Sequence, residues 1–524
     1  MLGRLLTVGG FTLLSRITGF LRDIMLAAIL GAGPVADAFF VALRLPNHFR
    51  AIFAEGAFNS AFVPAYARIR QQDGVDAARL FADRIFTLLF AAEAILLLLA
   101  LIFTPAVIRV LAPGFADEPG QFALAVSLTR ITFPYLLLVS LVTLYGGMLN
   151  AVQRFASPAG APMLLNLSMM ATLALAAFFP NAGHAAAWGV LIAGFLEALL
   201  VGADQSRHDG LPRFRAFAYN EDAKRFFKAL GPATLGSAGL QIALFADTII
   251  ATFLPAGALS ALYYADRLNQ FPIGVIGIAA GTVVLPEMAN RIAAGDERGA
   301  RYAQNRVIEL TLLMAIPFVA AFLIVPDQIM AGLFSRGKFT AADANAAAMT
   351  LAAYTVGLLP FVLIRSFTAT FLARGDTATP VKALLASVVI NVACKIALMG
   401  THAQVGLALA TSIGAWVNFG LVVLFAMRAG LVAIDERLRR SAVKLAVAGL
   451  ALTLALAASE RWLDVVFGDL HRLRAEAELA ALTSIGGIVY FGAVAALFGR
   501  RWLREFGKRR SPPPPAPPDR AGKT

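Results

Sequence analysis

Four arginines lie in stretches of this sequence that are otherwise apolar enough to cross a membrane. Arg16 and Arg22 belong to the first stretch, residues 5–30, whereas Arg50 belongs to the second and Arg267 to the eighth. A charged side chain at the bilayer centre costs roughly 3 kcal/mol, so four arginines facing lipid would cost on the order of 10 kcal/mol. We therefore expect them to line a polar cavity between helices. Guanidinium groups grip phosphate well, which predicts an anionic substrate.

An acid accompanies the arginines of the first stretch and admits two interpretations. Asp23 follows Arg16 by seven residues, so the two share one face of a helix, whereas Arg22 points elsewhere. Asp23 either takes part in the cavity or neutralises a neighbouring arginine and simply holds helices together.

The second apolar stretch is both interrupted and charged, which at membrane depth suits a cavity or a hinge. Its helix-breaking residues are Pro46, Gly56 and Pro64, and its charged residues are Asp37, Arg44, Arg50 and Glu55. We favour cavity roles for Arg50 and Glu55. Arg44 follows Asp37 by seven residues, so these two can also pair with each other.

Further charges lie in later apolar stretches. Asp266 and Arg267 are adjacent and must point in different directions from one helix, so that one can contact substrate while the other pairs across the molecule. Asp247 and Lys395 can form a buried ion pair with a structural or gating role. Arg365 is a further charge within the tenth stretch.

The elements that must position these residues are membrane-spanning helices. The chain has 524 residues, of which 59% are hydrophobic and only 15% charged, against about 25% charged in soluble domains. Apolar runs of about 20 residues recur along it, so we predict an all-α polytopic membrane protein. The candidate spans number about fourteen: 5–30, 34–66, 81–111, 122–151, 158–180, 185–203, 226–254, 258–290, 306–333, 344–373, 380–400, 404–428, 441–459 and 477–499.

The net charge of +13 does not indicate nucleic-acid binding. Residues 500–524 supply +6 of it, and most of the remainder lies in short loops between apolar stretches. These basic loops fall between even-numbered and odd-numbered spans, which predicts that both termini are cytoplasmic. The loops that hold Arg336 and Arg461 are exceptions.

The sequence contains no signature of an enzyme or a metal site. Cys394 is the only cysteine, and none of the five histidines forms a ligand-spaced pair. There is no nucleophile elbow and no phosphate-binding loop. We therefore expect no catalytic residue, no metal and no cofactor.

An internal repeat divides the chain. The run from Asp23 to Gly33 matches residues 247–257 at five of eleven positions, and paired aromatics and prolines repeat in the same order. Two six-span halves then share one orientation, and such parallel repeats place a substrate site at their interface. We predict four regions: an N-lobe at 1–205, a C-lobe at 206–430, two extra helices at 431–500, and a basic, proline-rich cytoplasmic tail at 501–524.

Several strings of residues resemble one known family, the MurJ (MviN) lipid II flippases. They include Arg22-Asp23, Asp37-Ala38-Phe39-Phe40, Leu45-Pro46-Asn47 with Arg50, Thr132-Phe133-Pro134-Tyr135, and Tyr263-Tyr264-Ala265-Asp266-Arg267-Leu268. The resemblance covers essentially the whole chain. It implies the fold of the multidrug/oligosaccharidyl-lipid/polysaccharide exporter superfamily, in which two six-helix lobes form a V. The two extra helices would form a groove for a lipid tail.

The resemblance also implies a function and a site. The substrate would be lipid II, the undecaprenyl-diphosphate-linked peptidoglycan precursor, moved to the outer leaflet of the bacterial cytoplasmic (inner) membrane by alternating access. Membrane lipids and cell-wall synthesis proteins are the expected partners. Residues expected to bind substrate are Ser15, Arg16, Arg22, Asn47, Arg50, Ser260 and Arg267. Those expected to gate or pair charges are Asp23, Asp37, Glu55, Asp247, Asp266 and Lys395.

One departure from the family pattern concerns the coupling ion. Some relatives bind sodium with acids in the seventh and eleventh spans, but Lys395 stands where the second acid would be. Its ammonium can occupy the place of the cation, which argues against a sodium site. A proton or the membrane potential also fits the sequence as an energy source.

Rival functions are separated by the chemistry they require. A flippase for another polyprenyl-linked glycan would need the same arginines. A drug or cation antiporter would favour an acidic cavity, and a membrane enzyme acting on lipid-linked sugars would need a catalytic acid or base at the outer face. A purely structural partner would need no buried arginine.

Overall fold

The computed structural model describes residues 2–50, 56–216, 220–468 and 473–507, and every regular element in these ranges is helical. The first half contains α1 (Leu2–Leu30), α2 (Pro34–Phe49), α3 (Gly56–Gln72), α4 (Val75–Ile102), α5 (Thr104–Leu111), α6 (Pro119–Thr132), α7 (Tyr135–Ala151), α8 (Ala156–Ala174) and α9 (Ala182–His208). Two short 3-10 turns, η2 (Pro113–Phe115) and η3 (Ala176–Phe178), lie between them.

The second half repeats this order of helices and then extends it. It contains α10 (Glu221–Ala251), α11 (Ala258–Pro272), the π-helical turn η4 (Ile273–Gly277), α12 (Ile278–Ala293), α13 (Glu297–Ile324), α14 (Pro326–Phe334), α15 (Ala341–Thr355), α16 (Leu358–Leu372), α17 (Ala378–Arg428), α18 (Glu436–Val466) and α19 (Arg474–Gly507). Helix-capping side chains start several of them. Asn220, Asp296 and Asp435 each accept a hydrogen bond from a backbone N–H in the first turn of α10, α13 and α18.

The predicted all-helical membrane fold is confirmed. Each predicted span corresponds to one helix or to a consecutive pair, except that the eleventh and twelfth are the two halves of α17, which breaks at Ala403. Within the described ranges, nine apolar helical stretches are long enough to cross a membrane. α1, which carries Arg16, Arg22 and Asp23, is not among the nine. The count of fourteen spans stays a prediction.

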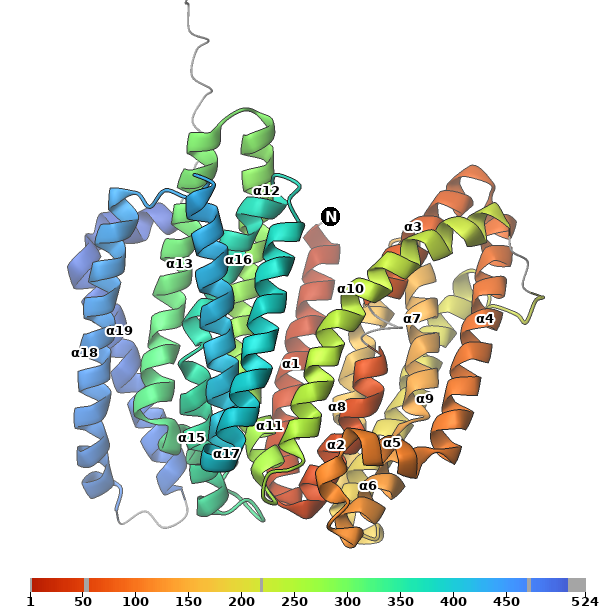
Figure 1. Cartoon of the computed structure of the whole chain (residues 1–524), viewed down its shortest axis with the longest axis horizontal. Helices are drawn as coiled ribbons and strands as arrows, with labels where there is room; N and C mark the ends of the chain where they lie inside the picture. Colours follow the sequence, from red (N-terminus) through yellow and green to blue (C-terminus); the bar gives the residue numbers. More distant parts are fainter. Residues whose placement is uncertain (1, 51–55, 217–219, 469–472, 508–524) are drawn as a thin grey trace, which may run out of the picture.

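The helices form two arms that meet at one end and separate at the other, which is the V shape implied by the family resemblance (Figure 1). α2 to α9 make one arm and α11 to α19 the other, while α1 and α10 run between them. α1 packs mainly on α8, and α10 packs along α3 and also contacts α17. α18 and α19 pack on α13 and α14. The domain boundaries and the lipid-tail groove of α18 and α19 stay predictions.

The arms are joined where α1 ends. Gly31 there has a φ of +72°, which glycine adopts without strain, and the Lys338 N–H donates to the Ala28 carbonyl over 2.8 Å. Nearby, the rings of Phe40 and Tyr263 stack with their centroids 3.9 Å apart. The backbone and ring contacts together close this end of the molecule.

The opposite, open end of the V carries the connections that the sequence marks as basic. The connections α3–α4, α12–α13 and α17–α18 all lie on that side, together with the N-terminal end of α1 (Figure 1). The predicted alternation of basic and non-basic loops therefore corresponds to two faces of the fold. Arg336, an exception in a loop at the closed end, forms an ion pair with Glu476 of α19 (3.0 Å).

Candidate functional site

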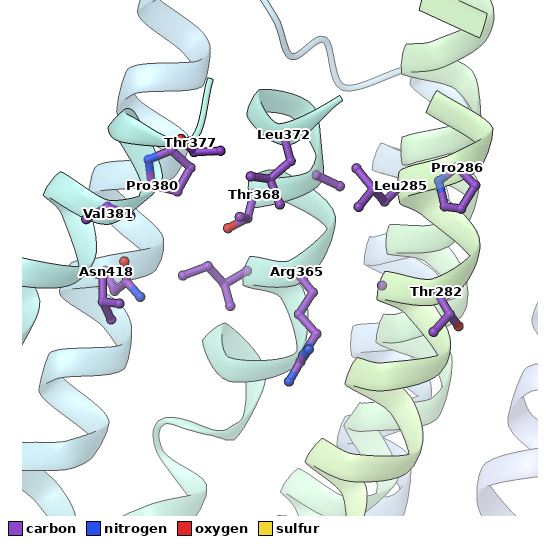
Figure 2. Close-up of a pocket in the computed structure, with 14 residues that line it drawn as sticks. Thr282, Leu285, Pro286, Arg365, Thr368, Leu372, Thr377, Pro380, Val381 and Asn418 are labelled. Atoms are coloured by element: carbon purple, nitrogen blue, oxygen red, sulfur yellow. The ribbon is translucent and has the colours of Figure 1, made fainter. Parts of the chain in front are cut away.

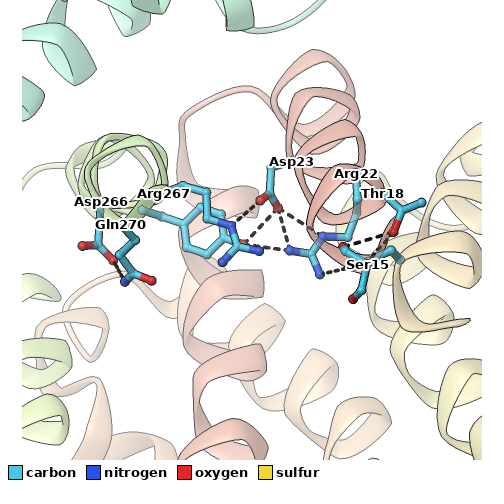
Figure 3. A network of polar contacts seen from close by, with 9 residues as sticks. Ser15, Thr18, Arg22, Asp23, Asp266, Arg267 and Gln270 are labelled. Atoms are coloured by element: carbon cyan, nitrogen blue, oxygen red, sulfur yellow. Dashed lines mark hydrogen bonds and ion pairs between the residues drawn. The ribbon is translucent and has the colours of Figure 1, made fainter. Parts of the chain in front are cut away.

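A buried carboxylate joins two of the four arginines across the two arms. Asp23 of α1 is fully buried. It accepts hydrogen bonds from Arg22 Nη2 over 2.7 Å and from Arg267 Nε over 2.5 Å, and Tyr263 Oη donates to it over 3.2 Å. Figure 3 shows Asp23 between the two guanidinium groups. Two cations share one anion here, so the cluster keeps an excess positive charge around a carboxylate that water does not reach.

The two arginines of this cluster differ in how open they are. Arg22 is 6% exposed, and its Nη1 donates to the amide oxygen of Asn166 in α8 over 3.0 Å. Arg267 has a side chain that is 39% exposed and uses only Nε in the contacts found among the described residues. Both arginines were predicted to bind substrate, but they differ in how far substrate can reach them. In this conformation Arg267 presents its terminal nitrogens, whereas Arg22 is enclosed.

Arg16 lies beside the π-helical turn that follows α11. Pro272 has no N–H to donate to the helix, and the five residues after it form a wider turn, a feature often found at functional sites. Gly274 in this turn has no side chain, and a Cβ atom there would lie 2.7 Å from Arg16 Nη1. Arg16 is exposed and forms no hydrogen bond or ion pair with other residues in the described part of the chain.

The prediction that Asp266 and Arg267 diverge is confirmed. Arg267 points toward Asp23, whereas Asp266 points away and accepts a hydrogen bond from Gln270 Nε2 over 2.6 Å (Figure 3). Among the described residues, Asp266 therefore forms no direct ion pair with the arginines of the cluster.

Asp37 joins the arms at their closed end. It is 2% exposed and accepts hydrogen bonds from the backbone N–H of Gly257 (2.7 Å) and of Ser260 (2.8 Å), and from the Ser260 hydroxyl (2.5 Å). A carboxylate of α2 thus caps the N-terminus of α11, where the helix dipole favours negative charge. The possible direct pairing of Asp37 with Arg44 is not found among the described residues, and Arg44 Nη1 donates instead to Thr248 Oγ1 of α10 (3.2 Å).

We expect Asp37→Asn to loosen this closed end, because the amide carries no charge and can accept through only one oxygen. The separation of the arms can be measured by double electron–electron resonance. Spin labels are attached to cysteines introduced at the exposed positions Asp117 and Ala342, in a Cys394→Ala background. The variant should populate longer distances than the parent. Asp76→Asn, which changes a fully exposed carboxylate, serves as the control. Identical distance distributions for Asp37→Asn and the parent would show that this cap does not hold the arms together.

Asp247 and Lys395 form the predicted ion pair, which joins α10 to α17, but only the lysine is buried, because the Asp247 side chain is 35% exposed. Lys395 is 2% exposed and lies in α17, a helix whose residues are largely apolar. Removing Asp247 leaves the buried Lys395 charge uncompensated, at a cost of up to about 3 kcal/mol. An isosteric apolar replacement of both partners is far less costly.

This asymmetry predicts a measurable rescue. Asp247→Asn should lower the thermal unfolding midpoint of the purified protein, and adding Lys395→Met in the same chain should restore most of the loss. Additive losses in the double variant would contradict the assignment of a coupled pair.

The remaining predicted site residues occupy varied places. Arg50 and Asn47 are partly buried near the end of α2, and Glu55 lies outside the described residues. Ser15 contributes its carbonyl, which accepts from Asn166 Nδ2 over 3.0 Å. Ser260 is fully buried against Asp37 rather than open to a cavity.

Sequence reasoning assigned no role to Asn166. This residue is 5% exposed and bonds α1 at both Arg22 and Ser15. Its signal in the sequence was an amide within an otherwise apolar span. Because Asn166 fixes the far side of the Arg22 guanidinium, it belongs to the positioning of the site.

The fold and this site define a class: a two-armed membrane transporter with an excess of positive charge between its arms. The same fold occurs in an inward-facing multidrug resistance MATE family transporter of the MOP superfamily, with a TM-score of 0.66 and 16% identity over 79% of this chain and 95% of that one. A solved lipid II flippase MurJ in an inward closed conformation gives a TM-score of 0.77 at 22% identity, over 96% of this chain and 99% of that one.

The sequence comparisons narrow the class to a family. The family model described as lipid II flippase MurJ matches residues 26–472. The probable lipid II flippase MurJ of Rhizobium meliloti is 38% identical over 94% of this chain and 93% of its own length. The lipid II flippase MurJ of Burkholderia cenocepacia is 34% identical over 96% of this chain and 97% of its own. This chain belongs to the MurJ family of lipid II flippases.

Proposed function

We propose that this chain moves lipid II from the cytoplasmic to the outer leaflet of the bacterial cytoplasmic membrane. The observation that carries the proposal is the cluster of Arg22, Asp23 and Arg267, in which two guanidiniums share one carboxylate between the arms. A diphosphate cannot enter hydrocarbon without its water unless other charges and donors replace it. An exposed guanidinium held in place by a buried acid supplies such a replacement.

The conformation fits the first half of an alternating-access cycle. The N-terminal end of α1 and the basic connections lie at the open end of the V, and the positive-inside rule assigns such a face to the cytoplasm. Both termini are then cytoplasmic, and the substrate headgroup enters from that side. Asp37 and the aromatic contacts keep the outer side closed until the arms rock about the site.

Release requires a weaker grip in the outward state. Asp23 already competes for Arg267, so a stronger pairing between them after rocking would displace the diphosphate. Arg16, Arg50, Asn47 and Ser15 complete the substrate site, and Glu55, Asp247 and Asp266 pair charges during the change of state. The chain acts as a transporter without a cofactor, and cell-wall synthesis enzymes that use lipid II are its partners.

Sodium is not the coupling ion in this proposal, because the ammonium of Lys395 already neutralises Asp247. Replacing sodium by choline on both sides of the membrane should leave the flipping rate unchanged. A rate that rises with a sodium gradient would contradict this part of the proposal.

The experiment that tests the function compares two substrates. The purified chain is reconstituted into liposomes that contain either lipid II or another polyprenyl-diphosphate glycan, and exposure of each headgroup to an impermeant hydrolase is followed. We expect rapid exposure of lipid II alone. Equal exposure of both would favour a general polyprenyl-glycan flippase, and no exposure beyond protein-free vesicles would overturn the proposal.

A further inference from the structure

A cavity lies in the arm formed by α11 to α19, apart from the Asp23 cluster. It has a volume of about 790 Å³ and is bounded by α12, α16 and α17. Such a size is typical of sites that hold a sizeable organic ligand. Figure 2 shows the lining residues of these three helices, with Leu285 of α12 pointing toward Leu372 of α16. The apolar part of the lining includes Leu285, Pro286, Ile364, Leu372, Pro380 and Val381.

One charge stands in this apolar lining. Arg365 is an exposed residue of α16, and it forms no hydrogen bond or ion pair with any other residue that the structure describes. Neighbouring polar groups are few and uncharged, among them Thr368 and Asn418. An unpaired arginine in a membrane-spanning helix costs roughly 3 kcal/mol unless water or a bound anion meets it. An apolar cavity with one guanidinium therefore suits a ligand that is itself apolar with an anionic group.

Arg365 also lies beside the same turn of the chain, η4, that Arg16 contacts. Arg16 lies against Gly274, and Arg365 lies against Gly277 three residues further on, where a Cβ atom would be 3.1 Å from Arg365 Nε. The two arginine side chains, from α1 and α16, thus follow one another along η4 and the start of α12. Beyond Arg365 the cavity extends past Leu372 to Thr377, near the open end of the V (Figure 2).

We propose that this cavity is an access subsite for the substrate, in which Arg365 holds phosphate while the apolar lining receives the adjoining isoprene units of the polyprenyl chain. The inference rests on the proposed function and deepens it. The diphosphate would meet Arg365 first and then pass to Arg16 and Arg267, which lie deeper between the arms. A membrane phospholipid offers the same chemistry, but its binding would not require Arg365 to lie beside the turn that Arg16 contacts.

The test measures binding of undecaprenyl diphosphate to the purified full-length chain by titration in native mass spectrometry. Arg365→Gln should raise the dissociation constant about tenfold, since it removes a charge-assisted hydrogen bond to phosphate. Arg365→Lys should retain most of the affinity. Arg130→Gln, which changes an exposed arginine of α6, should have no effect.

A second variant separates the lipid chain from the phosphate. A Cβ atom at Gly281 would meet only the Arg365 stem, at 3.7 Å, so Gly281→Leu fits locally and projects into the cavity. It should weaken binding of undecaprenyl diphosphate but not of inorganic pyrophosphate. Arg365→Gln should weaken binding of both.

Four outcomes decide the matter. The pattern above supports the subsite. Unchanged affinity in Arg365→Gln and Gly281→Leu, with wild-type binding intact, overturns the subsite alone. Equal competition by phosphatidylglycerol assigns the cavity to phospholipid and overturns the substrate assignment. No binding of undecaprenyl diphosphate by the wild type overturns the proposed function itself.

Discussion

Arg267→Ala is expected to lower the rate of lipid II flipping at least about 100-fold, because it removes two charge-assisted hydrogen bonds to phosphate worth about 1.5–3 kcal/mol each. Arg267 is the arginine whose Nε is fixed on Asp23 while the rest of the guanidinium is open. The measurement is the initial rate at which lipid II in proteoliposomes becomes accessible to an external muramidase. The flipping rate of Arg267→Lys should lie between the rates of the wild type and of Arg267→Ala, since lysine keeps the charge but loses the planar fork.

Arg130→Ala is the matched control for this experiment. Arg130 is also an arginine in a predicted span, but it is exposed on α6 and far in sequence from the cluster. Its loss should leave the rate within a factor of about two, as is usual for surface substitutions. A normal rate for Arg267→Ala would remove this residue from the substrate path.

Asp23→Ala is expected to destabilise the folded protein by about 3–5 kcal/mol, because two arginines lose their shared buried carboxylate. The effect is measured as a lower thermal unfolding midpoint of the purified chain. Asp76→Ala, at a fully exposed acid, should leave the midpoint unchanged.

A double variant tests the cause. Asp23→Ala combined with Arg267→Leu removes one of the two stranded charges, so it should be more stable than Asp23→Ala alone. If the double variant were less stable than either single variant, the arginine charges would not be the source of the loss.

The helical architecture could be predicted from the sequence because hydropathy and length determine which segments enter a membrane. The repeat of Asp23-to-Gly33 at residues 247–257 also predicted two similar halves, and the order of helices in the structure repeats accordingly. The Asp247–Lys395 pair could be expected as well, since few other partners exist for an isolated charge in an apolar helix.

The choice of partners within the site could not be predicted in the same way. Spacing along one helix suggested that Asp37 pairs with Arg44, yet Asp37 caps α11 because the backbone N–H groups at that helix start lie across the interface. Arg22 and Arg267 look equivalent in sequence, but Asn166 encloses only Arg22. Contacts between distant segments decide such differences, and periodicity along a single helix carries no information about them.

A structure of this chain with lipid II bound would show directly whether the exposed arginines hold the diphosphate between the arms. We expect phosphate oxygens about 2.8 Å from the guanidinium nitrogens of Arg267, with Arg16 alongside and Asp23 still bonded to Arg22. A diphosphate bound outside the space between the arms, with no contact to Arg16 or Arg267, would overturn the proposed role of these arginines.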